Sequence, residues 1–121
     1  MRRSMLFIPG NTPSLIMNGE ILGADSIILD LEDAVSPAEK DSARILVRNT
    51  LKHLGLKGCE IVIRINPVDT DFWFKDLDEI VPEVGKQALF RRLCRCIGDV
   101  FFQGGYLAGG DLCWKQSFKL L

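Results

Sequence analysis

The sequence lacks an excess of charge of either sign, and it lacks any long apolar run. Its 15 basic and 16 acidic side chains give a formal net charge of -1. Nucleic acids and acidic membrane surfaces bind concentrated basic faces, so this balance supports neither partner. No apolar run approaches the roughly 18 residues of a membrane span, and Pro9 and Gly10 end the first run too early for a secretory signal. We therefore expect a cytoplasmic protein.

Histidine and cysteine are also scarce. The single histidine, His53, falls in the last turn of a predicted helix, where a contact with the helix dipole is a simpler role than catalysis. The spacing of the four cysteines does not match a zinc site. A disulfide framework usually accompanies a small secreted domain, so we expect reduced thiols. These cysteines are Cys59, Cys94, Cys96 and Cys113.

What the sequence does contain is an alternation of short apolar strands and amphipathic helices. Strands are predicted at 5–8, from 26 to 30 and at 60–66, and helices at 13–23, from Ser36 to Gly55 and at 74–81. The second helix has the clearest start, because Ser36, Pro37 and Glu39 form a capping-box pattern. Such alternation is typical of an α/β fold with a parallel sheet.

The composition changes after Pro82. Residues 83–121 contain three of the four cysteines and six of the eleven glycines. A basic helix is predicted at 87–96 and a strand fragment at 100–102, but no fourth strand of the parallel sheet is expected. We therefore divide the chain into βα units at 1–82 and an unrelated tail at 83–121.

Three carboxylates, Asp30, Glu32 and Asp33, follow the second predicted strand within four residues. The carboxyl ends of parallel strands form the edge at which α/β proteins bind ligands. These acids could bind Mg²⁺, orient a substrate, or act as general acid and base. The alternative is a capping and salt-bridge role for the loop before Ser36.

Arg64 and Asn66 lie on one face at the end of the third predicted strand, because side chains alternate along a strand. The planar guanidinium of Arg64 can bind a carboxylate through two parallel hydrogen bonds. Alternatively, Arg64 neutralises the acids of the neighbouring strand. Both interpretations stay open from the residues alone.

Four ordered segments of the sequence resemble the HpcH/HpaI aldolase and citrate lyase family, and within it the citrate lyase β subunits. The resemblance extends from residue 2 to about 82. The segments that carry it are Arg3 to Asn11, Gly23 to Val35, Glu39 to Arg44, and Val62 to Asn66.

The resemblance implies a TIM-barrel enzyme, a homotrimer or homohexamer, that uses Mg²⁺ to cleave a 3-hydroxy acyl thioester. The substrate would be citryl on coenzyme A or acyl-carrier protein, the products oxaloacetate and an acetyl thioester, and the partners citrate lyase α and γ subunits. Arg64 matches the arginine that binds the substrate carboxylate, and Asp33 matches an acidic active-site residue. The family's Mg²⁺ ligands come from later strands, so no metal ligand is assigned here.

The length bears on these expectations, because a complete (β/α)₈ barrel takes about 250 residues. A chain of 121 residues is expected to form a partial barrel of about three βα units. The change after Pro82 suggests a frameshift or truncation and hence an inactive chain. A malyl-CoA lyase or other acyl-CoA lyase, and a non-catalytic acid-binding remnant, are the alternatives.

Overall fold

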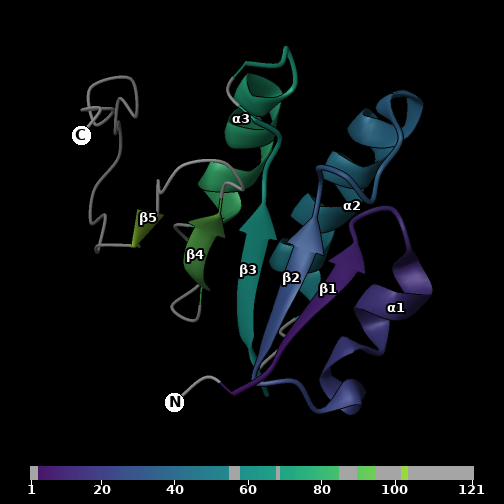
Figure 1. Ribbon diagram of the computed structural model, residues 1–121, viewed down its shortest axis with the longest axis vertical. Coiled ribbons are helices and arrows are strands. Elements are labelled where there is room, and N and C mark those ends of the chain that lie inside the picture. The colour runs from purple at the N-terminus through teal and green to yellow at the C-terminus, as the bar shows by residue number, and fades with distance from the viewer. Residues whose placement is uncertain (1–2, 55–57, 68, 85–89, 95–101, 104–121) are drawn as a thin grey trace.

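The strands form a single sheet whose first four members are parallel. The computed structural model describes residues 3–54, 58–67, 69–84, 90–94 and 102–103 (Figure 1). The sheet order is β1-β2-β3-β4-β5, and β5 runs antiparallel to β4. This arrangement confirms the predicted α/β fold with a parallel sheet. The strands are β1 (Met5–Pro9), β2 (Ser26–Asp30), β3 (Glu60–Arg64), β4 (Phe90–Cys94) and β5 (Phe102–Gln103).

The helices connect the parallel strands and share one apolar core with them. One buried cluster joins Ile16 of the first helix and Val47 of the second to Leu29 and Ile63 of the strands and Leu77 of the third helix. The core therefore lies between the sheet and the helices, with α2 and α3 side by side behind the strands in Figure 1. The helices are α1 (Pro13–Met17), α2 (Lys40–His53) and α3 (Trp73–Val84), with 3-10 turns η1 (Gly19–Leu22) and η2 (Pro37–Glu39).

The first predicted helix is broken into two pieces. Asn18 ends α1, and its side-chain amide donates a 2.8 Å hydrogen bond to the Ser14 carbonyl. Such local bonds compete with the helical ladder. Gly19 then allows a close approach to β2, since a β-carbon there would meet Ile27 Cδ1 at 2.8 Å. Gly23, with φ at 71°, closes the unit as predicted.

After Ser36 the chain turns helical as the capping-box pattern predicts, but first as the 3-10 turn η2, and α2 begins only at Lys40. Ser36 makes no side-chain capping bond to the backbone. Its hydroxyl instead donates to the Glu39 carboxylate at 2.8 Å, and Asn11 Nδ2 donates to the same oxygen at 3.2 Å. Glu39 therefore ties the start of α2 to the loop after β1.

The predictions for residues after Pro82 need correction. Pro82 does not end the third helix, because α3 continues through it to Val84. The expected basic helix at 87–96 is wrong, since Phe90–Cys94 forms β4 beside β3. A fourth parallel strand is therefore present, contrary to expectation. β5 overlaps the predicted strand fragment at residue 102, and residues 100 and 101 lie outside the described residues.

The face of the sheet away from the helices carries the alternate residues of each strand. On this face Met5 and Phe7 of β1 are about half exposed, whereas Ile28 of β2 and Val62 of β3 are buried. This face leads up to the carboxyl ends of the strands, where the predicted site residues lie. Within the described part of the chain, every helix is too short or too polar to cross a membrane.

Candidate functional site

The parallel register brings the predicted acids and arginine together at the carboxyl ends of the strands. Asp30 is the last residue of β2 and pairs in register with Arg64, the last residue of β3. Gly10, just after β1, donates its N–H to the Asp30 carbonyl at 2.8 Å. A β-carbon at Gly10 would meet that same oxygen at 2.8 Å, so glycine permits this close approach.

Arg64 is paired with all three predicted acids. Its Nη1 lies 3.1 Å from Asp30 Oδ2, its Nη2 lies 2.7 Å from Asp33 Oδ2, and its Nε lies 2.5 Å from Glu32 Oε2. The guanidinium carbon also stands 5.7 Å from the centre of the Phe7 ring, within cation–π range. We call Asp30, Glu32, Asp33 and Arg64 the rim cluster.

The three acids of the rim cluster differ in how firmly they are held. The Asp30 side chain is 3% exposed and accepts N–H bonds from Glu32 at 2.8 Å and from Ala34 at 3.3 Å. The Glu32 side chain is 10% exposed, whereas that of Asp33 is 77% exposed. Asp30 is therefore a fixed part of the loop, and Asp33 faces solvent.

The rim cluster contains more negative than positive groups. Burial raises the pKa of Glu32 above its usual range, the neighbouring Asp33 and Asp30 raise it further, and Arg64 opposes the rise. A carboxyl group that accepts a proton more readily than usual suits acid–base chemistry near neutral pH.

Asn66 does not join the rim cluster. Its side chain is buried, and its Nδ2 donates to the Leu31 carbonyl at 2.9 Å and to Asp76 Oδ2 at 2.7 Å. The expectation that Asn66 and Arg64 point together at a ligand is therefore not met. Asn66 instead supports the loop that carries the acids.

A second group of polar residues lies beneath that loop, and the sequence did not single it out. Asp76 of α3 is fully buried and accepts bonds from Arg44 Nε and from the backbone N–H of Asn66, both at 2.8 Å. Lys40 Nζ donates to the carbonyls of Leu31 at 2.7 Å and Glu32 at 2.5 Å. We call Lys40, Arg44, Asn66 and Asp76 the buried cluster.

Burial governs the electrostatics of Lys40. It lowers the pKa of this lysine, while the nearby carboxylates of Asp76, Asp30 and Glu32 oppose the change. Lys40 and Arg44 lie within a segment that carries the family resemblance, and their spacing places them on the same side of α2 as Ala43, Val47 and Leu51. This helical spacing was the signal that could have found them, but charged residues are seldom buried.

The described residues do not form a magnesium site. No group of three or more histidine, cysteine or acidic side chains in the described part of the chain is arranged to hold a metal. Each rim carboxylate already has an Arg64 nitrogen within 3.1 Å. Mg²⁺ needs free carboxylate oxygens in near-octahedral geometry, so these acids do not fit it in this arrangement.

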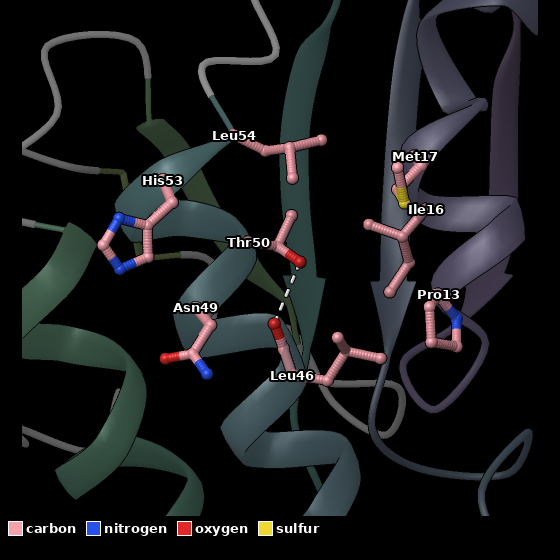
Figure 2. A pocket seen from close by; sticks show the side chains of 8 residues that line it. All are labelled: Pro13, Ile16, Met17, Leu46, Asn49, Thr50, His53 and Leu54. Atoms are coloured by element: carbon pink, nitrogen blue, oxygen red, sulfur yellow. Dashed lines mark hydrogen bonds between the residues drawn. The ribbon is translucent and has the colours of Figure 1, made fainter.

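His53 and a nearby apolar groove are separate from the rim. Figure 2 shows this groove, of about 210 Å³, between α1 and α2. His53 lies in the last turn of α2, the position that the sequence predicts, and Cys59 is a free thiol. The groove is lined by Pro13, Ile16, Met17, Leu46, Asn49, Thr50, His53 and Leu54.

The fold and the rim define an α/β protein with a cluster of charged side chains at the carboxyl ends of its parallel strands. The sequence pattern of the HpcH/HpaI aldolase/citrate lyase family matches residues 3–90. Because this match covers well over half of the 121 residues, the chain belongs to that family.

Within this family, the sequence is similar to citrate lyase β subunits and, at lower identity, to a malyl-CoA lyase. The citrate lyase β subunits of Leuconostoc mesenteroides subsp. cremoris and Haemophilus influenzae are 51% and 49% identical over 81 residues, 67% of this chain. An L-malyl-CoA/beta-methylmalyl-CoA lyase of Cereibacter sphaeroides is 35% identical over 83 residues, 69% of this chain. The aligned parts cover 27%, 28% and 26% of these relatives, so the chain spans about a quarter of their length.

A solved structure shares the same arrangement. The citrate lyase β subunit of Mycobacterium tuberculosis, solved with oxaloacetate and magnesium, superposes with a TM-score of 0.56 at 27% identity. The superposition covers 75% of this chain and 45% of that protein.

Proposed function

We propose that this chain supplies the first βα units of a citrate lyase β-like carbon–carbon lyase, and that its rim cluster binds a carboxylate of the substrate. The observation that carries this proposal is the position of Arg64 at the carboxyl end of the parallel sheet. A guanidinium there offers two parallel N–H bonds to a carboxylate. Membership in the family and the similarity to citrate lyase β subunits support the same assignment.

We further propose that residues 1–82 are the first part of a (β/α)₈ barrel and that most of residues 83–121 are a tail unrelated to it, although α3 extends to Val84 and β4 continues the parallel sheet beside β3. Parallel strands β1 to β3, with their helices on one face, support the barrel. In this proposal the chain works in a homo-oligomer and alongside citrate lyase α and γ subunits. The substrate is a citryl thioester on coenzyme A or acyl-carrier protein.

The rim residues are assigned binding and proton-transfer roles. Arg64 holds the carboxylate that becomes part of oxaloacetate, and its positive charge stabilises the negative charge that develops on the neighbouring hydroxyl oxygen as that oxygen loses its proton. Glu32 is the candidate acid–base group, because burial raises its pKa. Asp30 fixes the loop geometry, and Asp33 faces the solvent side of the ligand site. Magnesium, which the Mycobacterium tuberculosis relative contains, would come from ligands outside these residues.

Two alternatives rest on particular observations. The 35% identity to an L-malyl-CoA/beta-methylmalyl-CoA lyase favours a sibling lyase acting on a malyl thioester. The position of Arg64 at the strand ends would equally serve a protein that binds an acid without cleaving a thioester, which is the non-catalytic remnant.

A calorimetric titration with oxaloacetate, with EDTA present, tests the binding proposal. Arg64→Ala should weaken binding about 10- to 100-fold, because it removes charged hydrogen bonds. The matched control is Arg48→Ala, which removes a partly exposed arginine paired with Glu79 on α3. Equal affinity in the Arg64→Ala variant and the wild type would contradict the proposal.

A cleavage assay with Mg²⁺ then separates the alternatives. Release of oxaloacetate from citryl-CoA supports a citrate lyase β-like enzyme, and release of glyoxylate from malyl-CoA supports the sibling. Oxaloacetate binding without either release supports the non-catalytic alternative.

A further inference from the structure

The guanidinium of Arg64 is already occupied by carboxylates of the chain itself. Each of its three nitrogens lies within 3.1 Å of a different acid, Asp30, Glu32 or Asp33. A ligand carboxylate that binds two parallel N–H groups must therefore replace at least one of these acids. The rim cluster also carries three acids against one arginine, so a fourth carboxylate would bind against repulsion.

The three acids are not equally easy to displace. Asp30 is 3% exposed, and besides Arg64 it accepts backbone N–H bonds from Glu32 and Ala34. The Glu32 side chain is 10% exposed, and the backbone carbonyl of Glu32 accepts a hydrogen bond from Lys40 Nζ. Moving the Asp30 carboxylate would break its two backbone hydrogen bonds, which cost free energy when left unmade. Moving the Glu32 carboxylate would separate a largely buried charge from its partner Arg64, which is also costly.

Asp33 is the exception. Its side chain is 77% exposed, and its carboxylate pairs with Arg64 Nη2 at 2.7 Å. An exposed ion pair contributes little, because water solvates the separated charges well. Asp33 can therefore turn away from Arg64 into solvent at low cost, which makes room for a ligand carboxylate beside Nη2.

We propose that Asp33 is an internal competitor that occupies the ligand's place on Arg64 and is displaced when a substrate carboxylate binds. This inference rests on the proposed function, in which Arg64 binds that carboxylate. Asp33 then sets the affinity and the selectivity of the site. A ligand group must bind the guanidinium better than a side-chain carboxylate does, which favours acids that engage two N–H groups at once.

The test is the oxaloacetate titration with EDTA, applied to substitutions of Asp33 in the full chain. Asp33→Asn removes the competing charge, so we expect binding to become about threefold to fivefold tighter, the factor that an exposed ion pair is worth. Asp33→Glu keeps the charge and should bind within about twofold of the wild type.

Asp41→Asn is the matched control. The Asp41 side chain is 74% exposed and pairs with Arg44 Nη1 at 2.5 Å, so this change also removes an exposed acid beside an arginine. It should leave oxaloacetate affinity unchanged. An equal gain in affinity with Asp41→Asn would show a general charge effect and overturn the inference.

The outcomes separate this inference from the proposed function. Unchanged or weaker binding by Asp33→Asn, together with loss of binding by Arg64→Ala, would overturn the competitor role and leave the carboxylate site standing. Absence of binding by both the wild type and Asp33→Asn would instead reject the carboxylate site itself.

Discussion

The rim cluster and the buried cluster lie on opposite sides of the same loop, which joins β2 to α2, and both pair carboxylates with cations. In the buried cluster the carboxylate of Asp76 is fully enclosed and accepts bonds from Arg44 and Asn66. In the rim cluster one arginine meets three acids, of which Asp33 is largely exposed.

The two clusters therefore have different roles: the buried cluster supports the loop, and the rim cluster is the proposed site of ligand recognition. Charges enclosed with their partners are costly to disturb, so the buried cluster fixes the position of the loop. Charges in excess at an open edge can exchange partners with a ligand at low cost. The buried cluster therefore holds the loop in place, while the exposed side chain of the rim cluster can change its partner. Four substitutions test this contrast, from the largest expected effect to the smallest.

The largest effect is expected from Asp76→Ala. This change leaves Arg44 buried without the carboxylate that its Nε contacts at 2.8 Å. Removing one partner of a buried pair costs about 3–5 kcal/mol, and we expect that loss in the free energy of unfolding, measured with urea. Asp78→Ala, at an exposed position of the same helix, is the control. Similar losses from both changes would mean that Asp76 has no special role.

A smaller loss is expected from Lys40→Met. Methionine fills a similar space but donates no hydrogen bonds to the carbonyls of Leu31 and Glu32. Each carbonyl keeps one other donor, Asn66 Nδ2 for Leu31 and the Val35 N–H for Glu32, so what is lost is the pair of bonds from the charged Lys40. We expect that loss to cost about 1–3 kcal/mol of stability, which thermal and urea unfolding can measure. Lys75→Met, at an exposed position of α3, should change stability little. If the two variants were equally stable, Lys40 would not support the loop.

Glu32→Gln should increase stability slightly at neutral pH. Burial raises the pKa of Glu32, so its charged form is less favourable in the folded than in the unfolded protein. Stability therefore falls as pH rises from 4.5 through the raised pKa, and Glu32→Gln removes this fall. Melting curves from pH 4 to 8 should show a gain that disappears near pH 4.

Asp25 provides a control, because its pKa is lowered in the folded protein whereas that of Glu32 is raised. Hydrogen bonds from Arg3, the backbone N–H first, lower the pKa of Asp25 to about 2. Its contribution to stability is present above pH 3.8 and is lost as pH falls toward 2. Asp25→Asn should therefore destabilise the protein at neutral pH. A Glu32→Gln variant that behaves like Asp25→Asn would contradict the raised pKa.

The smallest effect is expected from Asp41→Asn. The Asp41 carboxylate is exposed, and its partner Arg44 keeps the buried bond to Asp76. Water screens such a pair, so thermal unfolding should not distinguish this variant from the wild type. A clear loss of stability would show that exposed and buried pairs do not differ here as described.

The sequence predicted the parts of this structure that depend on local patterns. Buried strand runs located the first three strands, and the proline after Ser36 located the helical turn η2 that leads into α2. The parallel order then placed Arg64 beside Asp30, because equivalent strand ends meet at one edge. These features follow from residues close together in the chain.

Features that depend on distant contacts were missed. Phe90–Cys94 was predicted as helix, yet it pairs with β3, and tertiary pairing of this kind overrides local propensity. Asp76 resembles any acid in an amphipathic helix until Arg44 and Asn66 meet it from other elements. For the same reason Asn66 was assigned to the rim although its side chain turns beneath the loop.

The central claim is that Arg64 exchanges an internal carboxylate for one from a ligand. It is tested most directly by the side-chain nitrogen resonances of ¹⁵N-arginine-labelled protein during titration with oxaloacetate. We predict that the Arg64 resonances shift with ligand concentration, while those of Arg44 and Arg48 stay constant. Arg64 resonances that stay constant while oxaloacetate binds would contradict the claim.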